Sequence, residues 1–73
     1  MNYTVFDVET ANNNRDSICS IGIVRVENDD IVFEKEYLIN PECEFNYFNI
    51  NVHGITPDMV EDKPNFVAVW GKI

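Results

Sequence analysis

The pattern of apolar and polar positions predicts two strands in the first part of the chain. Residues 3–9 are β-branched or aromatic apart from two acids, and residues 18–27 form a nearly continuous apolar run. Short runs of this kind are typical of strands, and the second indicates a strand buried on both faces. The polar stretch 10–17 predicts a loop that connects the two strands.

A third strand is predicted over residues 31–39, where apolar and acidic side chains alternate. The alternation predicts one face formed by Ile31, Phe33, Tyr37 and Ile39 and an opposite face that carries Glu34 and Glu36. Residues 27–30 have the composition of a turn, so the second and third strands are expected to form a hairpin.

The rest of the chain predicts a long loop followed by two short helices. An aromatic-rich connection occupies residues 41–55, and connections of that length are usually functional or packed over something. Thr56 and Pro57 have the residue types of an N-cap and a first helical position, and Pro64 ends that helix. Asn65 is expected to cap a second helix.

The second predicted helix carries an apolar stripe at helical spacing, formed by Phe66, Val69, Trp70 and Ile73. Gly71 offers an alternative, a helix of one turn that ends there, but the stripe continues to the last residue. A domain of 73 residues is close to the size at which only about 60% of the unfolded surface is buried. We therefore expect residues 1–73 to be the N-terminal portion of one larger domain.

Composition fits a globular protein and argues against a basic nucleic-acid surface. The chain is 45% apolar, and its 13 Asp and Glu against 5 Lys and Arg give a net charge of −8. Proteins that neutralise phosphates usually present a basic face. Carboxylates can instead hold divalent cations, which supply positive charge to a phosphate substrate. The alternative for most of these acids is solubility alone.

Cysteine usage and targeting signals point to the cytoplasm. Cys19 lies in an apolar run and is expected to be a small core residue, while Cys43 lies in a polar loop without a C-x-x-C partner. The N-terminus lacks the charged and apolar regions of a secretory signal, and no run approaches the roughly 18 apolar residues of a membrane span. No membrane association is expected.

Asp7 and Glu9 are the candidate metal ligands. They stand two residues apart in the first strand, so their side chains project from the same face with Cα atoms about 6.6 Å apart. Unpaired charges in an apolar strand are costly and need an explanation. One explanation is a solvated strand end or an ion pair with a nearby basic residue. The other is convergence of both carboxylates on one or two cations.

Four segments in order resemble the motifs of the DnaQ-like (DEDD) 3′→5′ exonuclease family, which includes the proofreading epsilon subunits of bacterial DNA polymerase III. The first, Val5-Phe6-Asp7-Val8-Glu9-Thr10, is similar to the first exonuclease motif nearly to the letter. The others are residues 20–26 (SIGIVRV), 38–41 (LINP) and 52–60 (VHGITPDMV). Each is weak alone, but the series covers almost the whole chain.

The resemblance implies an α/β, ribonuclease H-like fold: a mixed sheet with flanking helices, of which this chain supplies the first three antiparallel strands and the first short helices. It implies hydrolysis of nucleic acid from the 3′ end at two Mg²⁺ or Mn²⁺ ions, with release of nucleoside 5′-monophosphates. Asp7 and Glu9 match the first-motif carboxylates. The family's other two acids and its general-base histidine match nothing here, so the chain alone is expected to be inactive.

Three further residues match substrate-binding positions of the family. His53 corresponds to a histidine near the terminal nucleotide, Thr10 to a residue whose backbone lies beside it, and Phe48 to a position where relatives touch substrate. Structural roles are the alternative for each: incidental loop placement, a loop hydrogen bond and loop packing. The chain departs from many relatives at Ala11-Asn12, where they have Thr-Gly, and this puts the approach of that loop to the nucleotide in question.

The expected partners are the 3′ end of single-stranded nucleic acid, with DNA favoured over RNA, and DNA polymerase subunits. Unpaired strand edges also favour a homo-oligomer. Two other hypotheses stay open: a catalytically silent acidic protein-interaction module on the same fold, and a small cation-binding domain unrelated to nucleases. The latter lacks the oxygen spacing of an EF-hand.

Overall fold

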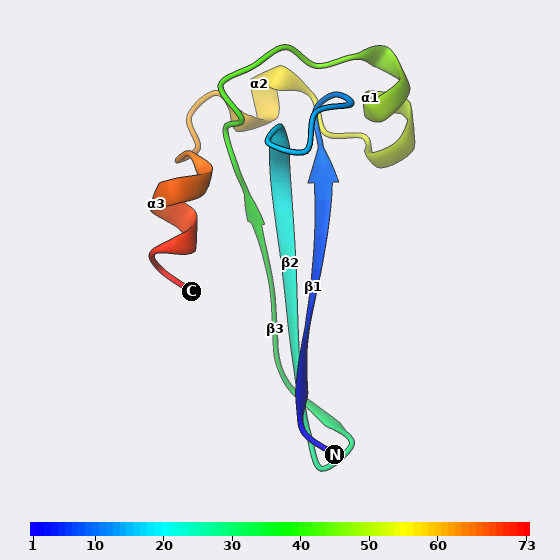
Figure 1. The fold of residues 1–73 in the computed structure, drawn as a ribbon, viewed down its shortest axis with the longest axis vertical. Helices are drawn as coiled ribbons and strands as arrows, with labels where there is room; N and C mark the ends of the chain where they lie inside the picture. Colours follow the sequence, from blue (N-terminus) through cyan, green and yellow to red (C-terminus); the bar gives the residue numbers. More distant parts are fainter.

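The computed structural model describes residues 1–73, which form one antiparallel sheet and three short helices. The strands are β1 (Tyr3–Thr10), β2 (Ile18–Glu27) and β3 (Asp30–Leu38), and they lie side by side in the order β1-β2-β3. The sheet is long and narrow, in a molecule of 40 × 24 × 19 Å (Figure 1). The three predicted strands and the buried central position of β2 are confirmed.

The predicted hairpin joins β2 to β3 through Asn28 and Asp29. Both residues have positive φ, 51° and 68°, as the two central residues of a type I′ turn require. One prediction for β3 is wrong: Ile31 does not share a face with Phe33. Arg25 pairs with Phe33 but its neighbour Val26 pairs with Ile31, so an additional residue in β3 reverses the alternation there.

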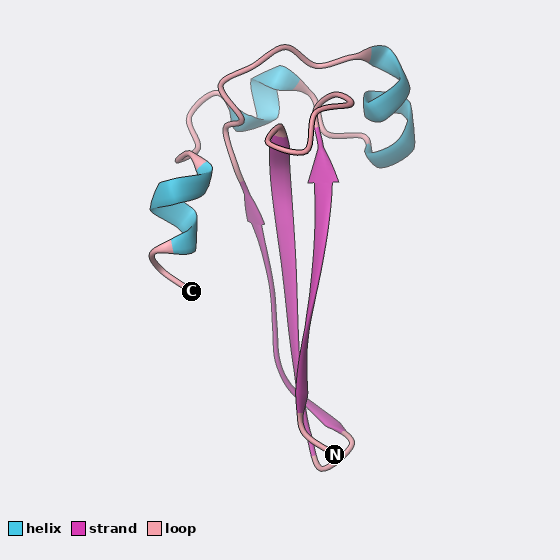
Figure 2. Cartoon of the chain, viewed as in Figure 1, coloured by secondary structure: helices cyan, strands magenta, loops and turns pink.

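The helices are α1 (Tyr47–His53), α2 (Pro57–Val60) and α3 (Phe66–Trp70). Figure 2 shows α1 and α2 gathered at one end of the sheet and α3 along its flank, while the hairpin end carries strands alone. α2 and α3 lie in the predicted helical segments. α3 ends at Trp70 with Gly71 as its C-cap, as the alternative expected, so the prediction that the helix follows the stripe to Ile73 is wrong. α1 lies inside residues 41–55, so the prediction of an uninterrupted loop there is wrong.

α1 and α3 begin at side-chain caps, whereas Thr56 stands at the predicted N-cap position of α2 without a capping hydrogen bond and donates its hydroxyl to Asp58 at 2.6 Å instead. The Asn65 side chain accepts a hydrogen bond from the amide of Ala68 at 3.0 Å and caps α3 as expected. Asn46 caps α1 in the same way, through the amide of Asn49 at 2.8 Å. α1 ends at Gly54, whose φ of 76° is the left-handed conformation that glycine adopts without strain.

The core consists of two small clusters on opposite faces of the sheet. One contains Ile21, Ile23, Ile39 and Val69, so it joins α3 to the sheet; the other contains Cys19, Ile55 and Val60. Tyr37 packs against the first and its neighbour Leu38 against the second. Successive residues of a strand point to opposite faces, which places the two clusters on either side of β3.

Only part of the apolar stripe of α3 is buried. Val69 is buried, whereas Trp70 is half exposed and lies against Phe6 of β1 and Phe66 of its own helix, with ring centroids 5.9 and 5.8 Å apart. Because Phe6 and Asp7 are consecutive in β1, α3 covers the face of the sheet opposite to the two candidate carboxylates. That second face stays open beyond the α2 end.

Candidate functional site

Asp7 and Glu9 lie on the open face of the sheet. Their partners in the ladder are Gly22 and Ser20 of β2. Asp7 is exposed and Glu9 is partly buried. The basic side chain of Arg25, one of the predicted ion-pair partners, instead contacts Glu27 at 3.0 Å. Neither carboxylate forms an ion pair with a basic side chain.

An open depression of about 350 Å³ lies beside Asp7. Its floor includes Gly22, which has no side chain to fill it, and its far side is formed by β3 with Glu34 and Glu36. The register places Asp7, Gly22 and Glu36 in one row across the three strands, so the prediction that the two β3 acids share a face is confirmed. Lys35 also lines the depression, so its three carboxylates and one lysine give it a net negative charge.

The carboxylate pair is a partial ligand set. Within residues 1–73, no group of three or more His, Cys, Asp or Glu side chains lies close enough to hold a metal ion. Mg²⁺ prefers about six oxygen ligands in an octahedron and keeps several waters. Asp7 and Glu9 have the donor chemistry that such an ion needs and leave most of its coordination positions to water, substrate or other residues.

Thr10 and His53, two of the predicted substrate-binding residues, are brought together. The Thr10 carbonyl oxygen lies 2.8 Å from Nε2 of His53, and Nδ1 of His53 accepts a hydrogen bond from the amide of Ile55 at 2.9 Å. With Nδ1 as the acceptor, Nε2 is the nitrogen that donates to the Thr10 carbonyl. Both nitrogens are occupied by backbone, which leaves the ring face and carbon edge for other contacts.

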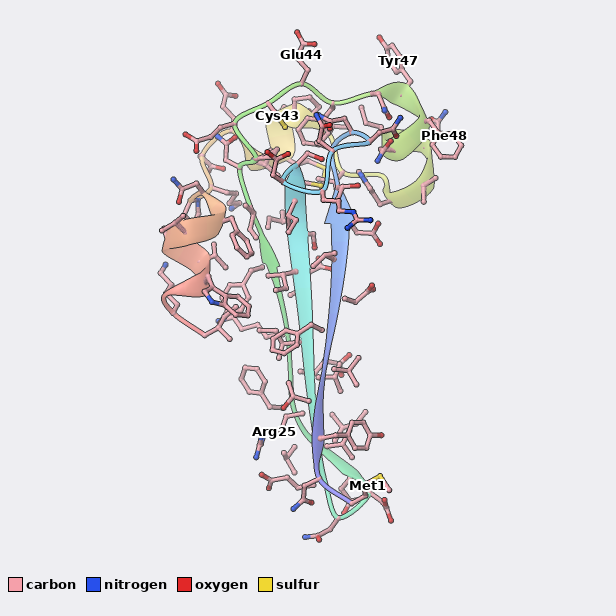
Figure 3. All side chains as sticks on the ribbon, in the orientation of Figure 1. Met1, Arg25, Cys43, Glu44, Tyr47 and Phe48 are labelled. Atoms are coloured by element: carbon pink, nitrogen blue, oxygen red, sulfur yellow. The ribbon has the colours of Figure 1, made fainter.

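Phe48, the third predicted substrate-binding residue, lies away from this contact. Its side chain is 74% exposed and projects outward from α1 beside Tyr47 (Figure 3). Phe48 therefore does not pack into the protein as the alternative hypothesis expected. It offers a free aromatic face at the same end of the sheet as Thr10.

Asn49 is a site residue that the sequence analysis missed. Its side-chain amide donates to the Thr10 carbonyl at 3.1 Å and lies 3.2 Å from the Thr10 hydroxyl, so it contacts the same residue as His53. The sequence does contain an indication of this helix. Asn46 is a suitable N-cap and Gly54 a suitable C-cap for the seven residues between them. On that helix, Asn49 and His53 stand four residues apart and share a face.

The departure at Asn12 has a structural explanation. Its side-chain amide donates to the Glu44 carbonyl at 2.7 Å, and its side-chain oxygen accepts from the amide of Asn14 at 2.8 Å. The larger side chain thus holds the loop after β1 against residues 40–46 instead of projecting toward a ligand.

Cys19 is a buried cysteine next to Glu9 and His53. Its sulfur is 3.6 Å from the Glu9 carbonyl and 3.9 Å from Nε2 of His53. Burial, reinforced by the negative charge of Glu9, raises the pKa of the Cys19 thiol to about 11 from an ordinary 9.0. The thiol is therefore protonated and unreactive at neutral pH, and the predicted core role of Cys19 is confirmed.

Comparison with known proteins identifies the family. The family model described as "Exonuclease" (RNase_T) matches residues 4–73, almost the whole chain. The chain belongs to the exonuclease family. This confirms the DnaQ-like resemblance, and the three antiparallel strands with short helices are those of its ribonuclease H-like fold.

The relatives of this exonuclease-family chain are much longer than the chain itself. It is 38% identical over 72 residues to the PolC-type DNA polymerase III of Caldanaerobacter subterraneus subsp. tengcongensis, and 36% identical over 69 residues to that of Bacillus subtilis. These matches cover 96% and 92% of the chain but 5% of each relative. Each match thus covers only a small part of the polymerase relative.

A solved structure has the same fold as the chain. Exonuclease X in complex with 5′ overhanging duplex DNA superposes with a TM-score of 0.87 at 29% identity, over 94% of this chain and 41% of the other.

No helix of the exonuclease-family chain has the length and apolar character needed to cross a bilayer.

Proposed function

We propose that this chain carries the first carboxylate pair of a 3′→5′ exonuclease that acts on DNA. The observation that supports the proposal most directly is the placement of Asp7 and Glu9 on one open face of β1, beside an acidic depression and without cationic partners. Family membership and the DNA-bound state of the solved relative support the same substrate class.

Asp7 and Glu9 would hold divalent ions, Mg²⁺ or Mn²⁺, at this face. Their carboxylate oxygens are the hard donors that these ions prefer, and the open depression gives room for water and phosphate. Two such ions bound there would supply activation of water and stabilisation of charge on the scissile phosphate. The two side chains fix where on β1 that chemistry takes place.

The neighbouring residues would position the terminal nucleotide. Thr10 is fixed at the end of β1 by His53 and Asn49, so its backbone offers a rigid edge next to the carboxylates. The carbon edge and face of the His53 ring can pack against a sugar or base. Exposed Phe48 can stack on an unpaired base, a contact worth about 1–3 kcal/mol in single-strand binding proteins.

The polymerase relatives support two further parts of the proposal. A nuclease homologous to a segment of DNA polymerase III suits a proofreading role, with polymerase subunits as partners. The bacterial origin of these DNA polymerase relatives supports the expected cytoplasmic location. We also propose that residues 1–73 alone are inactive, because two carboxylates on one strand cannot set the geometry of a two-ion site.

The test uses the full-length protein and a 5′-labelled single-stranded oligonucleotide with Mg²⁺. We expect a ladder of shortened labelled products and release of nucleoside 5′-monophosphates. Asp7→Asn and Glu9→Gln should reduce turnover by at least about 10³-fold if each removes a metal ligand. The control is Asp30→Asn, which removes an exposed carboxylate at the far end of β3 and should leave turnover unchanged.

Two results would contradict the proposal. Wild-type turnover by folded Asp7→Asn and Glu9→Gln proteins would exclude these residues as ligands. Absence of any nuclease activity in the wild-type protein would favour the silent protein-interaction module instead.

A further inference from the structure

The carbonyl group of Thr10 lies where the ladder between β1 and β2 becomes irregular. Glu9 pairs with Ser20, but Thr10 pairs with Ile18, so Cys19 is an additional residue in β2. Bulges of this kind interrupt the regular hydrogen bonds of a sheet and often lie near active sites. A buried or partly buried carbonyl at such a point needs a donor from outside the ladder.

Two side chains of α1 supply that donor. Nε2 of His53 and Nδ2 of Asn49 lie 2.8 and 3.1 Å from the Thr10 carbonyl oxygen. Nδ2 of Asn49 also reaches the carbonyl of Asn12 at 3.3 Å. One carbonyl oxygen at the end of β1 is therefore held by two donors that lie one helical turn apart on α1.

The peptide group that follows Thr10 is fixed on its other side as well. The amide of Ala11 donates to the Ser17 carbonyl at 2.7 Å, and the Ala11 carbonyl accepts from the amide of Asn46 at 2.9 Å. The strand end next to Glu9 is thus held from both sides by the loop after β1 and by α1.

Asn49 is an unfavourable residue at this position if its only role is to fill space. Its side-chain oxygen is buried and has no hydrogen-bond partner. An unsatisfied buried polar atom is uncommon in folded proteins and calls for a specific reason. An apolar side chain would fill the same space without leaving that oxygen unpaired, whereas only a donor can hold the oxygen atoms of Thr10 and Asn12.

We propose that Asn49 is a positioning residue that fixes the end of β1 and thereby the direction of the Glu9 carboxylate. This inference rests on the proposed function, because it assigns to Asn49 the support of a metal ligand. Groups that orient a metal ligand without touching the metal typically contribute 10–100-fold to metal affinity. Asn49 acts through the backbone, so its contribution lies at the lower end of that range.

The experiment measures Mn²⁺ binding to the full-length protein by calorimetry, without substrate. Asn49→Leu removes the donors, keeps the side chain neutral and retains a good helix former. We expect the dissociation constant for Mn²⁺ to rise about 10-fold, with the number of sites per protein unchanged. The matched control is Asn51→Leu, an exposed position on the same helix, which should leave the dissociation constant unchanged.

The dissociation constant and the number of sites together distinguish a loss of positioning from a loss of folding. A variant that is partly unfolded binds fewer ions per protein, but its folded fraction keeps the wild-type dissociation constant. If leucine does not fit beside Thr10, Asn49→Ala removes atoms only and carries the same expectation. A dissociation constant within about twofold of wild type in a folded Asn49 variant would overturn the inference.

The Glu9→Gln variant shows whether a negative result refutes only the role of Asn49 or the proposed metal site as well. If Glu9→Gln weakens Mn²⁺ binding and the Asn49 variants do not, Glu9 is a ligand and Asn49 does not position it. If Glu9→Gln itself binds Mn²⁺ as tightly as wild type, the proposed metal site is wrong, and the inference about Asn49 is wrong with it.

Discussion

Gly22 lies directly opposite Asp7 in the ladder between β1 and β2, on the floor of the acidic depression. A Cβ atom at position 22 would meet the Asp7 carbonyl oxygen at 3.8 Å, an ordinary contact. Space beside the Asp7 carboxylate therefore depends on the size of the residue at position 22, and alanine fits there without displacing the backbone.

Substitutions at Gly22 should separate stability from activity. Glycine within a strand costs roughly 0.5–1 kcal/mol relative to alanine, so we expect Gly22→Ala to raise the free energy of unfolding slightly. Gly22→Leu should fill the depression and reduce turnover by at least about tenfold, as steric exclusion of a phosphate requires. Urea unfolding and oligonucleotide shortening measure the two effects. Full activity of a folded Gly22→Leu protein would show that substrate does not enter beside Asp7.

The two cysteines should differ in reactivity. Cys43 is exposed and Cys19 is buried, and burial raises the pKa of the Cys19 thiol to about 11. Because the thiolate is the reactive form, we expect a thiol reagent at pH 8 to modify one cysteine in the folded protein and both in urea. Mass spectrometry of peptides identifies the modified residue. Equal modification of both cysteines in the folded state would contradict the buried position of Cys19.

The same pKa difference predicts a loss of stability in alkali. Between pH 9 and 11, the folded state retains the Cys19 proton while the unfolded state releases it, so the unfolded state binds fewer protons. The free energy of unfolding then falls as pH rises. We expect the fall from pH 8 to pH 10 to be steeper in the wild-type protein than in Cys19→Ala, which lacks the thiol. Parallel curves for the two proteins would contradict the pKa assignment.

Capping by Asn65 should stabilise α3 and its contact with the sheet. The Asn65 side chain satisfies the Ala68 amide, and removal of an asparagine cap typically costs about 1 kcal/mol. We expect Asn65→Ala to lower the free energy of unfolding by that amount, and Asn65→Asp, which keeps the accepting oxygen, to lower it less. Chemical unfolding monitored by the fluorescence of Trp70 reports on this helix directly. An unchanged midpoint in Asn65→Ala would mean that packing of Val69 alone holds α3.

The strands and the carboxylate pair could be predicted because both depend on local spacing. Apolar runs define strands, and the two-residue period places Asp7 and Glu9 on one face whatever surrounds them. The alternation rule failed at Ile31 because an additional residue in β3 changes the register. Such a shift depends on how two strands pair, which the composition of either strand does not reveal.

α1 could not be predicted from apolar periodicity because it buries none of its residues. Its seven residues are held instead by the caps at both ends and by the hydrogen bonds of Asn49 and His53 to Thr10. Thr10 and Asn49 are 39 positions apart in the sequence. Their contact follows from tertiary structure, so sequence spacing indicates Thr10 and His53 only as separate candidates.

Approach of the substrate should depend on divalent ions more than on basic side chains. This chain has a net charge of −8 and five Lys and Arg residues, so it offers little long-range attraction for phosphate. For a single strand, the logarithm of the binding constant falls by about 0.7 per phosphate contact for each tenfold rise in salt concentration. We expect a shallow slope, with a magnitude below about 2, because few counterions are displaced by basic residues.

The measurement is fluorescence anisotropy of a short labelled strand with the full-length protein, with Ca²⁺ in place of Mg²⁺ to suppress turnover, at several concentrations of KCl. Affinity should fall sharply when the divalent ion is removed. His53→Ala should weaken binding of the 3′ end, because it removes the ring face and carbon edge proposed to pack against the terminal nucleotide. It should also lower the free energy of unfolding by about 1–3 kcal/mol, because the Ile55 amide loses its partner and the Thr10 carbonyl keeps only Asn49. A steep salt slope, or equal affinity with and without Ca²⁺, would show that basic side chains, and not divalent ions, bind the strand. In that case Asp7 and Glu9 would contribute to the chemical step and not to capture of the substrate.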